Sequence, residues 1–110
     1  MHIAETECRA RSLRISITTD EGIEMGHCNL LLGRNDLHKK PFALLEDVFV
    51  GETWRGQGIG RRLVMAAIVR AKQEGAYKLI ASVRAQKTHL IAWYESLGIK
   101  PAGTSLRMDL

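Results

Sequence analysis

The chain has 110 residues, of which 45% are hydrophobic and 25% charged, and these proportions predict a single folded domain over residues 1–110. They argue against a disordered chain, and no apolar run approaches the roughly 20 residues that a membrane-spanning helix needs. The formal net charge of +4 and the isoelectric point near 9.4 fit an anionic partner. Charge alone does not separate nucleic acid from a phosphorylated small molecule, and a basic solvated surface fits equally well.

The start of the chain and its cysteines indicate a cytoplasmic protein. Residues 1–5 include an acid and lack the basic and apolar regions of a signal peptide. Cys8 and Cys28 are therefore expected to be free thiols in a reducing compartment, although their even number leaves a disulfide open. Neither cysteine has neighbours at metal-ligand spacing, so no metal site is predicted.

The hydrophobic pattern predicts a domain of the α+β class. Alternating polar and apolar residues indicate strands, and apolar residues at helical spacing indicate two helices that end at Gly75 and Gly98. The order of these elements predicts a mixed, mostly antiparallel sheet that is flanked by helices and contains one parallel crossover. The expected elements are strands 11–19, 23–32 and 42–50, helix 61–74, strand 77–83, helix 88–97 and strand 104–110.

A glycine-rich loop joins the third expected strand to the first helix. Its sequence is Arg55-Gly56-Gln57-Gly58-Ile59-Gly60. Glycine at alternate positions lets the backbone approach a ligand, and residues 54–63 contain no Ser, Thr, Asp or Asn that could cap the helix. Arg61 and Arg62 stand where the helix dipole disfavours positive charge. A phosphate group at this helix start would resolve these features together, whereas a plain glycine-rich connection is the simpler alternative.

Two segments together resemble the signatures of a known family. The loop, which follows Val48-Phe49-Val50, is similar to the Gln/Arg-x-x-Gly-x-Gly/Ala cofactor signature of the GNAT N-acetyltransferases. The segment Trp93–Ile99 resembles that family's aromatic-Tyr-Glu-x-x-Gly-aromatic segment. The likeness runs from about Leu44 to the C-terminus with both motifs in the family's order and separation, which makes it far more specific than the loop alone.

The resemblance implies a GNAT-like acyl-CoA N-acyltransferase fold that lacks the family's usual first strand and helices. It also implies acetyl-CoA as co-substrate, a primary amine as acceptor, and no metal. The strand end would pair with the pantetheine arm like an added strand, and the loop would hold the pyrophosphate. The residues that the resemblance assigns to the cofactor are Val48, Phe49, Val50, Arg55, Gly56, Gln57, Gly58, Ile59, Gly60 and Arg61.

Acetyl transfer to an amine requires a base for the amine proton, donors for the oxyanion and an acid for the departing thiolate. The resemblance assigns the acid to Tyr94, a position that also fits a core aromatic residue. We expect Glu46 to be the base or the amine anchor, with a salt-bridged strand residue as the plainer alternative. Because Asp47 is adjacent in the same strand, the two side chains should point to opposite faces.

Other residues are weaker candidates for proton transfer, and two positions depart from the family pattern. The weaker candidates are Glu52, His27 and His89. Lys87 stands where many relatives carry an Asn that contacts the pantetheine arm. Arg84 stands where relatives that acetylate sugar phosphates carry an acid, which argues against that substrate. Glu46-Asp47-Val48 nevertheless resembles the Glu-Asp-Val/Ile stretch of glucosamine-phosphate acetyltransferases.

Several questions stay open at the level of sequence. The short N-terminal side removes part of the family's acceptor wall. A second copy of the chain in a homodimer could supply it, or the acceptor could be large and the site open. A non-catalytic acyl-CoA-binding or sensor module would keep the loop without the chemistry. A small basic nucleic-acid-binding domain is disfavoured because two Phe, two Trp and two Tyr make a poor stacking platform. The acceptor stays open among amino acids, polyamines, aminoglycosides, peptide N-termini and protein lysines.

Overall fold

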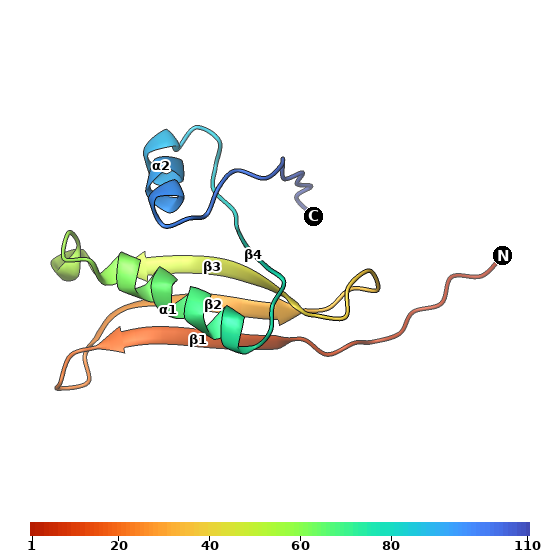
Figure 1. Cartoon of the computed structure of the whole chain (residues 1–110), viewed down its shortest axis with the longest axis horizontal. Coiled ribbons are helices and arrows are strands. Elements are labelled where there is room, and N and C mark those ends of the chain that lie inside the picture. Colours follow the sequence, from red (N-terminus) through yellow and green to blue (C-terminus); the bar gives the residue numbers. More distant parts are fainter.

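A four-stranded sheet with the strand order β1-β2-β3-β4 forms the centre of the computed structural model, which describes residues 1–110 (Figure 1). The pairs β1/β2 and β2/β3 are antiparallel and the pair β3/β4 is parallel, which confirms the predicted mixed sheet with one crossover. The elements are β1 (Arg11–Thr18), β2 (Glu24–Gly33), β3 (Phe42–Val50), the 3-10 helix η1 (Glu52–Trp54), α1 (Ile59–Gln73), β4 (Lys78–Ala81) and α2 (Thr88–Ser96).

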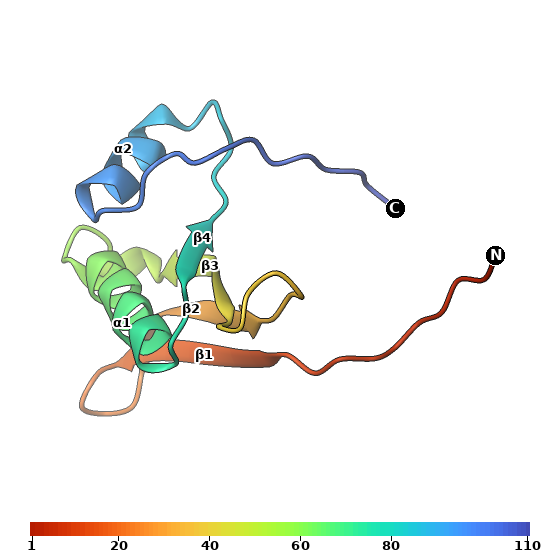
Figure 2. The ribbon, with the colours of Figure 1, turned by 45° about the vertical axis from the view of Figure 1, so that its right-hand side comes forward.

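The two helices occupy different places around the sheet. Helix α1 lies across one face of the strands, and α2 lies apart from the sheet, close to the start of α1 (Figures 1 and 2). Residues 1–10 extend away from the sheet without regular structure. No helix has the length and the apolar character that would let it cross a membrane.

The core lies between α1 and the sheet, because both present apolar side chains at the period of their own structure. Strand β2 buries alternate residues, whereas α1 buries residues three or four positions apart. The buried side chains are Cys28, Leu30, Leu32, Ala43, Leu45, Ile59, Leu63, Val64, Ala67, Ala71 and Tyr94. Tyr94 is the buried residue that α2 contributes, and so it joins α2 to the rest of the core.

The predicted strand at residues 104–110 is wrong. This segment forms no regular structure, and Leu106 and Met108 are 94% and 81% exposed. The alternating sequence alone cannot make a strand, because an extended segment needs a hydrogen-bonded neighbour and an apolar surface to cover. The adjacent strand β4 has four residues and pairs with β3 alone.

A β-bulge interrupts the pairing of β2 with β3. Asn29 pairs with Glu46 and His27 with Phe49, so two residues of β3 stand opposite the single Cys28. Asp47 has a φ of 54° and is the one non-glycine residue with a positive φ. The bulge resets the alternation of side chains along β3.

The prediction that Glu46 and Asp47 point to opposite faces is therefore wrong. Leu45 is buried, and Val48 packs against the same core two residues after Glu46. Asp47 instead contacts His27 and Asn29, which alternate with the buried residues of β2. Both carboxylates consequently lie on the side of the sheet that does not face α1.

Strands β3 and β4 pair over only part of their length. The parallel register runs from Phe42 opposite Lys78 to Leu45 opposite Ala81. Because β3 continues to Val50 while β4 ends at Ala81, the edge of β3 from Glu46 onward has no neighbouring strand on that side. This splayed edge is where the functional site forms.

Shortening Leu63 to alanine should destabilise the fold strongly. Leu63 is fully buried on the core side of α1, so Leu63→Ala should lower the free energy of unfolding by about 2–5 kcal/mol. The matched control Met65→Ala lies two residues along the same helix at 40% exposure and should change it by less than about 1 kcal/mol. Urea denaturation measures both values, and equal losses would contradict the proposed core.

Candidate active site

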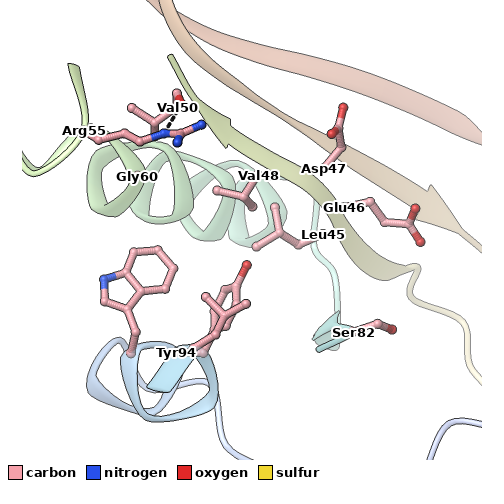
Figure 3. Close-up of a pocket in the computed structure, with 11 residues that line it drawn as sticks. Leu45, Glu46, Asp47, Val48, Val50, Arg55, Gly60, Ser82 and Tyr94 are labelled. Atoms are coloured by element: carbon pink, nitrogen blue, oxygen red, sulfur yellow. Dashed lines mark hydrogen bonds between the residues drawn. The ribbon is translucent and has the colours of Figure 1, made fainter. Parts of the chain in front are cut away.

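A pocket of about 620 Å³ opens beside the splayed edge of β3 (Figure 3). Its walls come from β3, from the start of α1, from α2 and from the end of β4. The residues that line it are Leu45, Glu46, Asp47, Val48, Val50, Arg55, Gly60, Ser82, Leu90, Trp93 and Tyr94. The pocket therefore joins segments from both predicted motifs, which are more than 30 residues apart in the sequence.

The start of α1 carries free backbone donors. Gly58 is the residue before the helix, with a φ of 80°, and no side chain caps the helix. The amides of Ile59, Gly60 and Arg61 have no acceptor within the chain. The predicted uncapped helix start is thus confirmed, and its geometry suits an anion.

Glycine at positions 56 and 58 is explained by the backbone conformation rather than by crowding. Gly56 and Gly58 have φ values of 77° and 80°, which side chains rarely adopt, and a Cβ at either position would meet no atom within 4 Å. At Gly60, in contrast, a Cβ would lie 3.6 Å from the Trp93 ring. Trp93 thereby packs α2 against the first turn of α1.

Arg55 is held at the end of β3. Its Nε donates a hydrogen bond of 3.0 Å to the carbonyl oxygen of Val50, and its guanidinium lies 5.7 Å from the centre of the Phe49 ring. Gln57 donates from Nε2 to the carbonyl oxygen of Thr53 at 3.3 Å, which ties the loop to η1. The positive charge of Arg55 is thus fixed at the end of the pocket next to α1.

The pocket contains only some of the residues that were predicted to be catalytic or to bind the cofactor. Six of the predicted site residues line the pocket, namely Glu46, Val48, Val50, Arg55, Gly60 and Tyr94. Phe49 is 48% exposed and lies outside the pocket, and the Ile59 side chain is buried in the core. The remaining predicted residues lie on the exposed loop and helix start beyond the pocket wall, and they are Gly56, Gln57, Gly58 and Arg61.

Tyr94 lies at the centre of the pocket wall that α2 provides. Its residue exposure is 9%, and its ring meets Trp93 edge-on at 4.9 Å. Figure 3 shows the hydroxyl of Tyr94 pointing from α2 toward β3. Burial raises the pKa of Tyr94 above its ordinary value of 10.0, with a smaller contribution from Cys28. The hydroxyl therefore keeps its proton at neutral pH and can donate it.

The carboxylates of Glu46 and Asp47 form an acidic end of the pocket (Figure 3). The Oδ2 atom of Asp47 accepts hydrogen bonds from Nε2 of His27 at 3.0 Å and from Nδ2 of Asn29 at 3.2 Å. The second ring nitrogen of His27, Nδ1, lies 3.4 Å from Oε2 of Glu24 but is not hydrogen-bonded to it.

A surface ion pair continues this polar row. Arg14 donates two hydrogen bonds to Glu24, at 2.5 and 3.0 Å. The hydrogen bond from Arg14 is the main cause that lowers the pKa of Glu24. Arg14 is thus hydrogen-bonded to Glu24, and the charge of Asp47 also contributes to the raised pKa of Arg14.

Five lining residues were not among the predicted site residues, and they are Leu45, Asp47, Ser82, Leu90 and Trp93. Asp47 was expected on the face opposite to Glu46, and the bulge brings it to the same side. Trp93 stands in the motif that contains Tyr94, so the sequence could have predicted that Trp93 also lines the site. Ser82 follows β4 directly, and the carboxyl ends of parallel strands are common binding positions. Leu45 and Leu90 carry no sequence signal beyond a core role.

The fold is that of a known class of acetyltransferases. The family described as Acetyltransferase (GNAT) family matches residues 4–99, and the chain belongs to it. Members of this family use acetyl-CoA as the acetyl donor. The predicted family and fold are thus confirmed.

Three relatives illustrate the likeness. A protein of Drosophila melanogaster named as a probable glucosamine 6-phosphate N-acetyltransferase is 35% identical over 67% of this chain and 33% of its own length. A glucosamine 6-phosphate N-acetyltransferase of Trypanosoma brucei brucei is 33% identical over 60% and 43%. The solved structure of a Trypanosoma brucei acetyltransferase shares the fold at a TM-score of 0.80 and 24% identity, covering 90% of this chain and 69% of that one. The chain thus spans less than half the length of these two curated relatives.

The raised pKa of Tyr94 predicts a loss of stability in alkali. A tyrosine whose pKa is higher in the folded state stabilises the fold fully below pH 10, the unfolded value, and this contribution is lost as the pH rises through the folded pKa. Tyr94→Phe should therefore show a smaller fall in the free energy of unfolding than the wild type as the pH rises above the unfolded value of 10.0. The buried Cys28 thiol, whose pKa burial also raises, contributes the same fall to both proteins.

Urea denaturation at several pH values measures this difference. Tyr77→Phe is the matched control, because it also removes a phenol hydroxyl but lies outside the pocket. An unchanged alkaline fall in Tyr94→Phe would show that the ring is not buried as described.

Proposed function

We propose that the pocket binds acetyl-CoA and that the chain transfers the acetyl group to a primary amine. The observation that carries this proposal is that one pocket joins Gly60, at the start of α1 where the amides are free, to Tyr94 and to the two carboxylates of β3. Acetyl-CoA supplies the activated thioester carbonyl when it is bound. The chain's own residues supply the binding groups and the proton transfers.

The residues at the α1 end of the pocket suit the phosphates of the coenzyme. The amides of Ile59, Gly60 and Arg61 point out of the helix start without acceptors, and Arg55 adds a fixed positive charge. Together these groups match a pyrophosphate in charge and in hydrogen-bond donors.

The splayed edge of β3 suits the pantetheine arm. Residues 46–50 have no strand on the side where β4 has ended, so backbone groups on that side, apart from the Val50 carbonyl oxygen that accepts from Arg55, can pair with an extended ligand. Val48 and Val50 line the pocket along this edge and offer apolar contact. Of the predicted set, Phe49 and Ile59 can contribute only backbone groups, because their side chains point elsewhere.

Two side chains in the pocket support the proposed proton transfers. Tyr94 is a buried, protonated hydroxyl opposite β3 and acts as the acid toward the thiolate sulfur. Glu46 lines the same pocket with an exposed carboxylate and acts as the base that takes a proton from the acceptor amine. Glu52 lies outside the pocket lining, as do His27 and His89.

The acceptor is proposed only as a primary amine. The two curated relatives are named for glucosamine 6-phosphate, but the chain spans 33% and 43% of their lengths. Arg84 stands where sugar-phosphate relatives carry an acid and lies outside the pocket lining. The same proposal includes three further expectations from the sequence. The chain is a single domain over residues 1–110, it is located in the cytoplasm, and a second copy completes the acceptor wall.

Gly58→Ala should weaken acetyl-CoA binding. The change forces a side chain onto a residue with a φ of 80°, which turns the loop amides away from the position that binds phosphate. Gly75→Ala is a matched control, because Gly75 has a φ of 75° with equally open surroundings but lies at the other end of α1. Calorimetry should show at least about tenfold weaker binding for Gly58→Ala alone. Similar losses in both variants would contradict the loop's role.

Tyr94→Phe should bind acetyl-CoA like the wild type and transfer acetyl more slowly. Loss of a general acid lowers kcat by about 10²–10⁴-fold, whereas removal of one hydroxyl leaves the aromatic contact with Trp93 in place. Calorimetry measures binding, and thiol release over a panel of primary amines measures transfer. Absence of wild-type binding would overturn the proposal. Binding without transfer to any amine would favour a non-catalytic acyl-CoA sensor.

A further inference from the structure

Asp47 is held in an unusual conformation at the mouth of the pocket. It is the one non-glycine residue with a positive φ, and it stands at the bulge where β3 leaves the regular register with β2. Bulges and left-handed residues often serve to aim a side chain at a site. The side chain of Asp47 is 61% exposed, so burial does not explain its placement.

The hydrogen bonds of Asp47 leave one oxygen free. His27 and Asn29 both contact the same atom, Oδ2, at 3.0 and 3.2 Å. A carboxylate only accepts hydrogen bonds, so Nε2 of His27 carries the hydrogen in this contact. The two donors fix the carboxylate plane from one side, and Oδ1 remains available to a cation.

The charges of the pocket are separated along its length. Arg55 lies at the end next to α1, and Glu46 with Asp47 lies at the opposite end (Figure 3). No lysine, arginine or histidine lines the acidic end. On the outer face of the sheet, Arg14 is hydrogen-bonded to Glu24, and His27 donates to Asp47 from β2. The two carboxylates therefore favour a cation over a phosphate at this end.

We propose that Oδ1 of Asp47 binds the ammonium group of a cationic alkylamine acceptor, with His27 and Asn29 as positioning residues. This inference rests on the proposed function, because it assigns the acceptor side of the same pocket. It separates two roles, since Asp47 anchors the charged amine and Glu46 removes its proton. It also places the preferred acceptors among alkylamines and lysine-like side chains rather than phosphorylated amino sugars.

Nuclear magnetic resonance titration tests the anchor without requiring turnover. The probe is butylamine, which is cationic at pH 7 like a lysine side chain, and butanol is its neutral counterpart. Butylamine should shift the amide signals of Asp47 and Asn29, whereas butanol should not. Asp47→Asn should weaken butylamine binding about 10-fold or more, as expected when a hydrogen bond to a charged group is lost. The control Asp20→Asn, in the turn after β1, should bind like the wild type.

A second variant tests the positioning role. Asn29→Ala removes one donor to Oδ2 and should weaken butylamine binding about 3- to 10-fold, while Asn29→Gln, which restores an amide donor, should recover part of it. In the transfer assay both variants should raise KM for butylamine with little change in kcat. Unchanged butylamine binding in Asp47→Asn, or equal shifts with butanol, would overturn the inference.

The two proposals fail in distinguishable ways. Butylamine binding that depends on Asp47, without acetyl transfer to any amine, would leave the anchor standing and overturn the enzymatic function. Acetyl transfer that is unaffected by Asp47→Asn would overturn the anchor and leave the enzymatic function standing.

Discussion

The parallel pairing of β3 with β4 ends after only four residue pairs, and the site depends on that early parting. Beyond Leu45 and Ala81 the edge of β3 has no neighbouring strand, so a pocket forms where a longer β4 would have continued the sheet. The start of α1 borders one end of the pocket, and α2 covers it through Trp93 and Tyr94. An uncovered strand edge usually invites aggregation. Here the helices flank it and leave room for an extended ligand.

The bulge at Asp47 performs a second function in the same strand. By placing two residues of β3 opposite Cys28, it returns Val48 and Val50 to the core side and leaves both acidic side chains on the outer side. The polar row from Arg14 through Glu24 and His27 to Asp47 is largely exposed, and exposed ion pairs contribute little to stability. The row instead orients side chains, because His27 hydrogen-bonds to one oxygen of Asp47 and Glu24 pairs with Arg14.

Local sequence patterns predicted most of the fold, because they depend on near neighbours. The hairpin, strand β3 and both helices were predicted within about two residues, and the helix start without a capping side chain is present as expected. Two predictions failed where long-range pairing decides the outcome. Residues 104–110 alternate like a strand but have no neighbouring strand to pair with. Glu46 and Asp47 would alternate in a regular strand, but the pairing with β2 contains a bulge in which Asp47 and Val48 lie opposite Cys28.

The sequence by itself determined the chemistry of single segments. It set a glycine loop before an uncapped helix, a tyrosine on the apolar stripe of a second helix, and two acids in the third strand. Tertiary structure alone decided which of these meet, because the pocket lies between segments more than 30 residues apart in the chain. The tertiary structure also decided that Asp47 lies on the same face of the sheet as Glu46 and that Phe49 lies outside the pocket. Side-chain direction in a strand depends on hydrogen-bond register with its neighbour, and that register is a property of the assembled sheet.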